Sequence, residues 1–162
     1  MFLKTERPSL ERLDHVDIKI LKLLQENSNI TTKELAQKVQ LSPTPVFERV
    51  KRLENHGYIK KYVAVLSPEK LNSGLTVFCN ITLKQHTKEI GNNFIKDIKS
   101  LAEVIECYNI SGDYDFLLKV LVKDMKHYQN FVLNKLGLIE NIGSAHSTFV
   151  MEKVKQSYAV PI

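Results

Sequence analysis

Apolar residues follow two different spacings along this chain. Up to about residue 57 they recur at intervals of three and four, as in Val46, Val50 and Leu53. This spacing places side chains on one face of a helix and therefore predicts helices. From Val77 onward many apolar residues alternate with polar ones, which indicates strands with one buried face. The chain is thus expected to join a helical N-terminal part to a part that combines strands and helices.

One predicted helix, over residues 43–54, carries an apolar stripe opposite a polar face. Ser42 stands at its N-cap, where a hydroxyl can accept a hydrogen bond from an N–H of the first turn. Pro43 and Pro45 lie in that turn, where a missing N–H costs little. Gly57 is expected to end the helix as the residue after its C-cap. A helix packed on one side and basic on the other is typical of a major-groove reader. The outer face holds Thr44, Glu48, Lys51 and Arg52.

The residues before this helix complete a helix-turn-helix. Thr31 and Glu34 form a capping box, in which each side chain accepts the backbone N–H of the other residue. Residues 40–42 then connect the first helix to the second, which is the spacing of a motif whose second helix reads DNA. The apolar positions of the first helix are Leu35, Ala36 and Val39.

Two further elements favour a winged form of this motif. Downstream, Tyr58–Val63 alternates like a strand and carries the adjacent lysines Lys60 and Lys61. Upstream, another helix is expected with Asp14 as its cap. The apolar positions of that helix are Leu13, Val16, Ile20 and Leu24. The pattern alone leaves a second interpretation open, a plain helical hairpin with solvated charges.

Charge favours DNA binding. Residues 1–62 hold twelve Lys or Arg against eight Asp or Glu, whereas residues 63–162 hold eleven against ten. Most of the net charge of +5 therefore lies in the N-terminal part, as expected for a surface that meets a polyanion. Because the excess is small, we expect one copy to bind DNA weakly and several copies to bind together.

The rest of the chain predicts an α+β domain. Residues 63–75 contain Pro, Gly, Ser and Asn and are interpreted as a connector. After them the order of elements is β-α-β-β-α-β, a ferredoxin-like pattern. The strand over Phe116–Val122 is nearly all apolar, so it must be covered on both faces or paired at its edge. Residues 1–10 are expected to form a mobile tail. Strands are predicted near residues 77–83, 104–110, 116–122 and 142–154, and helices near residues 90–101 and 125–136, the latter ended by Gly137.

Composition disfavours several classes of protein. No apolar run is long enough to span a membrane, and the N-terminus lacks the apolar segment of a signal peptide. We therefore expect a cytoplasmic protein with no membrane partner. Cys79 and Cys107 match no metal or redox spacing and are predicted to be buried strand thiols. We expect no metal and no cofactor.

An enzyme is also disfavoured. Asp113 and Asp115 lie in one turn, but alternate side chains of an extended segment point apart, so the two carboxylates need not converge for acid–base chemistry. His127 and His146 lack ligand spacing to each other. The chain has no nucleophile elbow, phosphate-binding glycine loop or HExxH motif.

The turn over residues 112–115 suits a free amino acid better. Asp115 could pair with the ammonium group of such a ligand. Backbone N–H groups around Gly112 could hold its carboxylate, since glycine tolerates the positive φ that an anion nest needs. The alternative is a purely structural β-turn, because Gly-Asp is a common hairpin connection.

Motifs at both ends of the chain point to a known family. The segments that carry them are residues 13–18, 41–45, 48–50, 112–115, 150–152 and 154–157. Together they resemble the Lrp/AsnC family of transcriptional regulators, also called feast/famine regulators, over roughly residues 10–157. The resemblance implies a winged helix-turn-helix (11–62), the connector, and an α+β domain for ligand sensing and oligomerisation (76–157). It also implies double-stranded DNA as a partner, homodimers that assemble into octamers, and an amino-acid effector.

The resemblance and the helix face together indicate two sets of site residues. The effector is implied to lie between dimers, and Thr148 and Phe149 depart from the leucine-sensing members, which leaves the identity of the amino acid open. The DNA-binding set is Ser42, Thr44, Pro45, Glu48, Arg49, Lys51 and Arg52, with Arg49 on the flank for a phosphate contact or an ion pair. The effector set is Tyr108, Gly112, Asp113, Tyr114, Asp115, Met125, Thr148, Phe149 and Val150.

The expected function is sequence-specific transcriptional regulation in response to an amino acid. One alternative is an architectural protein that organises DNA and senses nothing. Another is a regulatory module of an enzyme that uses the α+β domain.

Overall fold

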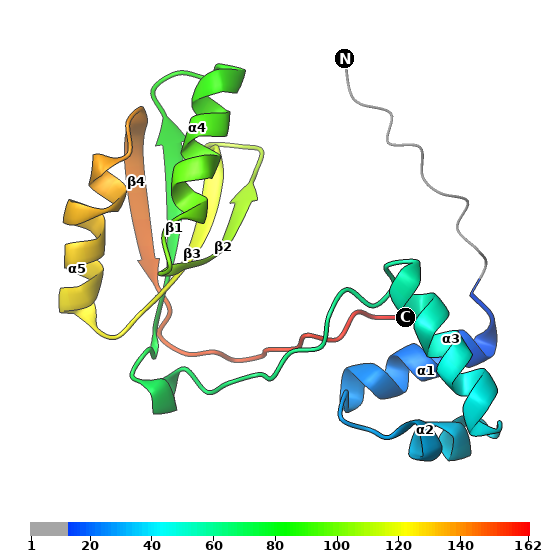
Figure 1. Cartoon of the computed structure of the whole chain (residues 1–162). Coiled ribbons are helices and arrows are strands. Elements are labelled where there is room, and N and C mark those ends of the chain that lie inside the picture. The colour runs from blue at the N-terminus through cyan, green and yellow to red at the C-terminus, as the bar shows by residue number, and fades with distance from the viewer. Residues whose placement is uncertain (1–12) are drawn as a thin grey trace. The chain divides into compact units, whose positions relative to one another are not determined.

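The computed structural model describes residues 13–162, so the tail predicted at residues 1–10 lies outside the described residues. The described chain forms two compact units, each with its own hydrophobic core (Figure 1). The first unit comprises residues 13–64 together with Lys155–Ile162, and the second comprises Val65–Val154. No helix of the described residues is long and apolar enough to cross a membrane.

The first unit is built from three helices, α1 (His15–Glu26), α2 (Thr32–Val39) and α3 (Pro43–Asn55). The predicted caps of α1 and α2 are confirmed, and both are capping boxes: Asp14 with Asp17, and Thr31 with Glu34. The buried apolar residues are Ile20, Leu35, Ala36, Val39, Val46 and Leu53. Two residues of the inner stripe predicted for α3 are thus buried, and the third, Val50, is half-buried against this core. The C-terminal residues join this unit, where Gln25 Nε2 donates to the Val160 carbonyl at 3.2 Å.

The ends of α3 follow the prediction in position but not in every contact. Ser42 is the N-cap residue, yet its side chain makes no capping hydrogen bond, so that part of the prediction was wrong. The reason is local, because Pro43 and Pro45 have no N–H and the first turn offers few donors. At the other end Gly57 adopts φ +75°, as expected of a glycine after a C-cap.

The strand predicted over Tyr58–Val63 is absent from the structure, so this prediction was wrong. This segment holds no strand, and the described residues contain only the strands of the second unit. A strand needs a neighbour for its backbone N–H and C=O groups, and alternation alone does not supply one. Directly after α3 the chain is instead tied back to the helix, since Ile59 N donates to the Leu53 carbonyl at 3.2 Å.

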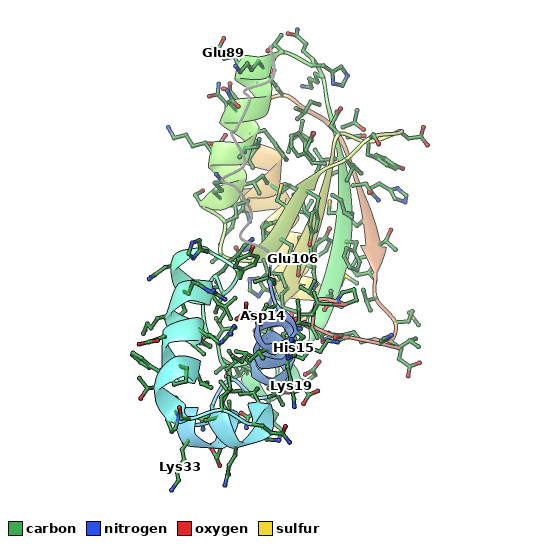
Figure 2. The ribbon with its side chains drawn as sticks, turned by 90° about the vertical axis from the view of Figure 1, so that its right-hand side faces the viewer. Asp14, His15, Lys19, Lys33, Glu89 and Glu106 are labelled. Carbon is green, nitrogen blue, oxygen red and sulfur yellow. The ribbon has the colours of Figure 1, made fainter. Side chains whose placement is uncertain are left out.

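The second unit is an antiparallel sheet with helices on one face. Its elements are β1 (Leu75–Leu83), α4 (Lys88–Lys99), β2 (Val104–Asn109), β3 (Phe116–Val122), α5 (Met125–Asn134) and β4 (Ile142–Phe149), with a 3-10 turn at Glu69–Leu71 before them. The strand order is β2-β3-β1-β4. Figures 1 and 2 show α4 and α5 on the same side of the sheet. The predicted α+β class and the ferredoxin-like order β-α-β-β-α-β are therefore confirmed.

Side chains of β3 alternate between two environments. Phe116, Leu118, Val120 and Val122 are buried beneath the helices. The residues between them lie on the face that no helix covers and are only partly buried. Within one chain the helices therefore cover a single face of this apolar strand, and the other face still offers apolar side chains such as Leu117 and Leu121.

Three expectations for the second unit were wrong in detail. Helix α5 ends at Asn134, so Gly137 does not end it and lies in a 3-10 turn, Leu136–Leu138. Strand β4 ends at Phe149 rather than near residue 154. Phe149 pairs with Val77, close to the start of β1 at Leu75, so residues after about 151 have no partner on β1. Cys79 is buried as predicted, but Cys107 is exposed, since β2 is an edge strand of the sheet.

Candidate functional site

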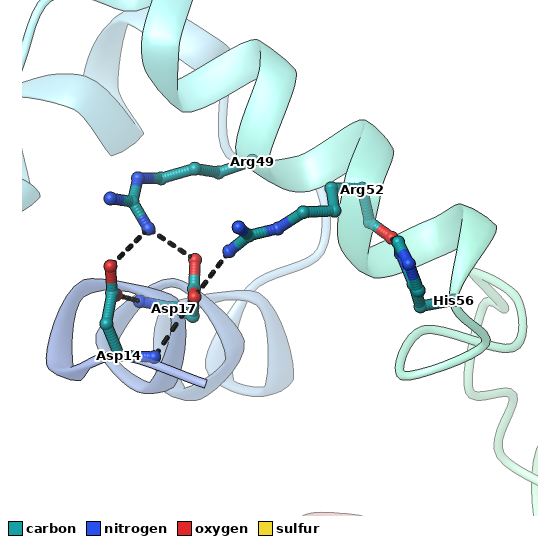
Figure 3. A network of polar contacts seen from close by, with 5 residues as sticks. All are labelled: Asp14, Asp17, Arg49, Arg52 and His56. Atoms are coloured by element: carbon teal, nitrogen blue, oxygen red, sulfur yellow. Dashed lines mark hydrogen bonds and ion pairs between the residues drawn. The ribbon is translucent and has the colours of Figure 1, made fainter. Parts of the chain in front are cut away.

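Two arginines of α3 are bound to α1. Arg49 Nη1 lies 2.7 Å from Asp14 Oδ2 and 2.7 Å from Asp17 Oδ1, and Arg52 Nη2 lies 2.5 Å from Asp17 Oδ2. Figure 3 shows both side chains reaching from α3 to the start of α1. The Asp17 side chain is 1% exposed, so it is a buried anion held by two cations. The expected phosphate contact or ion pair of Arg49 takes the form of an ion pair in this structure.

This network is close to electrically neutral, because two guanidinium groups meet two carboxylates. The backbone N–H of Asp17 and the guanidinium of Arg49 lower the pKa of Asp14 to about 2. Hydrogen bonds to Asp17 and Asp14 in turn raise the pKa of Arg49. The network therefore fixes α3 on α1 and adds little net positive charge to the surface of the unit.

The outer face of α3 is open to solvent. Thr44, Glu48 and Lys51 are exposed, as is Ser42, whereas Pro45 is half-buried. Lys51 Nζ lies 2.8 Å from Glu54 Oε2, which holds the lysine along the helix. The set predicted for DNA binding thus divides into outward side chains and the two arginines that bind α1.

One exposed residue of this face was missed by the sequence analysis. Phe47 is 52% exposed, and its ring centroid lies 5.8 Å from Lys51 Nζ. Its signal was present in the sequence, because it is a large apolar residue that does not belong to the stripe of Val46, Val50 and Leu53.

Further cations lie outside α3 in the first unit. Lys33 and Lys38 on α2 and Lys60 and Lys61 after α3 are exposed. Figure 2 shows Lys33 pointing away from the helices. Because Arg49, Arg52 and Lys51 are paired with carboxylates, the positive surface charge of this unit comes largely from other exposed lysines, which include Lys19 and Lys22 of α1.

The turn over residues 112–115 is pinned to β1. Gly112 adopts φ +118°, a conformation that side chains disfavour. Asp115 N donates to the Ile81 carbonyl at 2.9 Å, and Asp115 Oδ2 accepts from Leu83 N at 2.7 Å. The second carboxylate oxygen, Oδ1, lies 3.1 Å from His86 Nδ1. The Asp115 carboxylate therefore has a fixed position, with one oxygen on the backbone and the other on an exposed histidine.

Two tyrosines lie near this end of the sheet. The Tyr114 ring stacks on His146, with centroids 6.4 Å apart. Tyr108 pairs with Leu117 across β2 and β3, and its hydroxyl donates to Glu106 Oε2 at 2.6 Å. Together with Gly112, the exposed Asp113 and Asp115 they form one group around the turn, which we call the turn end.

The remaining predicted effector residues lie at the other end of the sheet. Phe149 pairs with Val77 and Thr148 with Phe78, while Met125 begins α5 directly after β3. Val77 and Ile81 are separated on β1 by about 13 Å, at roughly 3.3 Å per residue. This strand end group comprises Met125, Thr148, Phe149 and Val150. The structure therefore does not bring the nine predicted residues together in one chain.

The strand end group has its own contacts. Phe149 meets the ring of Tyr128 edge-on, with centroids 5.3 Å apart. Val150 N donates to the Thr76 carbonyl at 3.1 Å, the last backbone bond along this strand. Met125 is 55% exposed at the start of α5. Met125, Phe149 and Val150 supply apolar side chains and the group contains no charged residue, while Thr148 points to the opposite face of the sheet from Phe149.

The residues weighed for catalysis do not form one cluster. His146 stacks on Tyr114 at the turn end, whereas His127 Nε2 lies 3.3 Å from Glu103 Oε1 beside α5. The part of the chain that the structure describes contains no group of three or more His, Cys, Asp or Glu side chains placed to hold a metal ion.

Comparisons with known proteins match both units. Residues 13–60 match a model described as winged helix-turn-helix DNA-binding, and residues 76–160 match one described as Lrp/AsnC ligand binding domain. The chain is 42% identical to the leucine-responsive regulatory protein of Haemophilus influenzae, over 95% of this chain and 93% of the relative. It is 40% identical to the protein of that name from Escherichia coli K12, over 94% and 92%. These matches confirm the resemblance that the motifs indicated.

A solved structure gives the same result. A transcriptional regulator from Neisseria meningitidis, determined as a complex with L-Met, aligns with a TM-score of 0.89 and 37% identity, over 93% of this chain and 97% of that chain. The arrangement of elements found here is therefore also the arrangement of that regulator.

Proposed function

Because this chain belongs to the Lrp/AsnC family of DNA-binding transcriptional regulators, we propose that it binds specific DNA sequences through α3 and that an amino acid modulates this binding. The observation that carries the proposal is α3 itself. The helix is fixed on its inner side, exposes Thr44, Glu48 and Lys51 on its outer side, and lies in the region matched to a DNA-binding domain.

The seven predicted DNA-binding residues would have two different tasks. The outward residues of α3 would contact bases or phosphates, with Ser42 and Pro45 at the helix start close to the backbone of the duplex. Arg49 and Arg52 would act chiefly by holding α3 in place on α1, since their guanidinium groups are engaged by Asp14 and Asp17. Lysines around α3 would neutralise phosphates, which makes the affinity fall with salt concentration.

The effector would bind where the turn end of one chain meets the strand end of another. The two groups supply complementary chemistry, a carboxylate and backbone N–H groups on one side and apolar side chains on the other. They are too far apart in one chain for a single small amino acid to contact both. A second copy is therefore part of the proposed site, as the expected assembly of dimers into octamers would allow.

The ammonium group of the effector would bind Asp115 in place of His86. Asp115 Oδ2 is anchored by Leu83 N, so Oδ1 is the oxygen that can exchange partners. The carboxylate of the effector would accept hydrogen bonds from backbone N–H groups near Gly112. The complex of the Neisseria regulator with L-Met supports an amino acid as the ligand class, and the identity of the amino acid follows from the experiment below.

Dimerisation would use the face of the sheet that no helix covers. This face carries Phe78, Leu117 and Leu121 together with the ion pair of Lys119 and Glu106, whose Nζ and Oε1 atoms lie 2.7 Å apart. Packing two such faces would bury the apolar residues. A symmetric dimer would also place two α3 helices on half-sites about one helical turn, or a multiple of it, apart. Light scattering of the full chain at micromolar concentration tests this, and a stable monomer would contradict it.

Thermal unfolding of the full chain against each of the twenty amino acids tests the function. A selective effector at 100 times its Kd should stabilise the protein by about 2.7 kcal/mol. Gel-shift titration with and without that amino acid then shows whether it changes DNA affinity or assembly. DNA binding without any amino-acid effect would favour the architectural alternative, and the absence of DNA binding would reject the proposal. We propose a binding function and no catalysis.

A further inference from the structure

Phe47 is the only large apolar side chain that α3 exposes among the described residues. It is 52% exposed, whereas its neighbour Val46 is fully buried and Val50 is half-buried against the core. A helix advances by about 100° per residue, so Phe47 lies beside Thr44 and Lys51 on the outer side. The ring is therefore part of the surface that would face DNA and not part of the interior of the unit.

The ring is oriented by a charged neighbour. Lys51 Nζ lies 5.8 Å from the ring centroid and 2.8 Å from Glu54 Oε2. A cation near an aromatic face is attracted by the ring, and here the cation is also held by a carboxylate one turn along the helix. Phe47 is thus flanked by a positive charge on a helix that lacks other exposed apolar groups.

The ammonium group of Lys51 and the ring of Phe47 together are complementary to the major groove of DNA. The major groove is polyanionic at its edges, and its floor offers a single apolar group, the 5-methyl group of thymine. A lysine beside an exposed phenyl ring matches a phosphate beside such a methyl group. The carboxylate of Glu48 offers no comparable apolar contact, and the methyl group of Thr44 offers a much smaller one than the phenyl ring.

We infer that Phe47 contacts a thymine methyl group in the major groove and so determines part of the DNA sequence preference. This inference rests on the proposed DNA binding through α3 and adds a specificity residue to it. It predicts that one thymine in each half-site is recognised through its methyl group, apart from its hydrogen-bonding pattern.

The experiment uses a duplex selected from a random DNA library by the full-length chain. Each thymine of the selected duplex is replaced in turn by uracil, which keeps base pairing and removes only the methyl group. For the unaltered chain, one position per half-site should lose about fourfold in affinity, the value expected for one methyl group no longer buried. For Phe47→Ala, uracil at that position should make no difference.

Two further variants complete the test. Phe47→Leu keeps an apolar side chain and should keep the effect of uracil; if Phe47→Ala folds poorly, the polar variant Phe47→Gln takes its place and should remove the effect. Asn55→Ala changes an exposed residue at the end of α3, outside the predicted DNA-binding set, and should leave the effect of uracil unchanged.

The possible outcomes distinguish a failure of the role inferred for Phe47 from a failure of the proposed DNA binding. If the library yields no bound duplex, the proposed DNA binding fails. If DNA binds but no thymine is sensitive to uracil, or if the sensitivity persists in Phe47→Ala, the role of Phe47 is wrong while DNA binding stands.

Discussion

A single chain contains the whole of one candidate site of this protein but only separated parts of the other. The residues of the proposed DNA-reading surface all lie in the first unit, where α3 is fixed by contacts that begin and end in the same chain. The proposed effector residues instead lie at opposite ends of one sheet. Under the proposed function, a single chain would present its reading helix, whereas effector binding would require a second copy. Sensing would then be coupled to assembly by the geometry of the sheet.

The largest expected effect comes from breaking the ion pairs that hold α3 on α1. Asp17→Ala should destabilise the first unit by about 3 kcal/mol, because it leaves two arginines without their buried partner and removes half of a capping box. Urea unfolding followed by circular dichroism measures this. Asp113→Ala, which removes an exposed carboxylate, should change stability by less than about 0.5 kcal/mol. Equal effects of the two substitutions would show that the network does not hold the helix.

The second prediction addresses the turn end. Asp115→Ala should weaken effector binding by about 1.5–3 kcal/mol, because a charge-assisted hydrogen bond to the ammonium group is lost. DNA affinity in the absence of effector should stay unchanged, since Asp115 lies in the other unit. Isothermal titration gives the first quantity and gel-shift titration the second. Asp97→Ala, which removes an exposed aspartate of α4 outside the predicted effector set, is the matched control. Equal binding by the Asp115 variant and the unaltered chain would place the site elsewhere.

The third prediction tests whether the site is shared between chains. Phe149→Ala should weaken effector binding by roughly 1 kcal/mol through lost apolar contact at the strand end. Mixing Asp115→Ala and Phe149→Ala chains, followed by dissociation and reassembly, should restore full affinity at a minority of sites. Those sites would combine an intact turn end with an intact strand end from different chains. A mixture that binds no better than the separate variants would mean that one chain provides both groups.

The smallest expected effect is a loss of stability of the first unit when the pH is lowered. The pKa of Asp14 is lowered to about 2 in the folded chain, below the ordinary value near 3.8. Its contribution to stability is therefore present above about pH 4 and is lost as the pH falls toward 2. Asp14→Asn should reduce the change in the free energy of unfolding of the first unit over this pH range. The free energy of unfolding of the second unit should not change. Urea unfolding at pH 6, 4 and 3 provides the comparison, and an unchanged slope would contradict it.

Local rules accounted for most of the elements. The capping boxes of Asp14 and Thr31, the glycine after α3 and the alternation of β1 and β3 depend on residues close together in the chain. Such signals can be read directly, because short-range sterics and hydrogen bonding set them. The wrong expectations concerned elements whose extent depends on a distant partner, such as the end of β4 and the strand over Tyr58–Val63.

The candidate sites divide in the same way. The outer face of α3 follows from helical periodicity, and so Thr44, Glu48 and Lys51 were identified correctly as exposed. For Arg49 an ion pair was one of two expectations, whereas the pairing of Arg52 was not predicted. The partner Asp17 was not evident in either case, because it is more than thirty residues away in the chain. Phe47 was overlooked because an exposed phenylalanine differs from a core one only in its place relative to the stripe.

By itself the sequence determined the helices, the alternating strands, the basic first part and the motifs of the family, since each depends on composition or on neighbours along the chain. Only the tertiary structure decided which charges neutralise each other and which effector residues lie together. The pairing of β1 with β4 places Phe149 beside Val77, while the turn holds Asp115 beside Ile81 at the other end of the same strand. Sheet register separates residues that the sequence suggested as one site into two groups at opposite ends of the sheet, because strands hold successive residues about 3.3 Å apart and cannot bring their ends together.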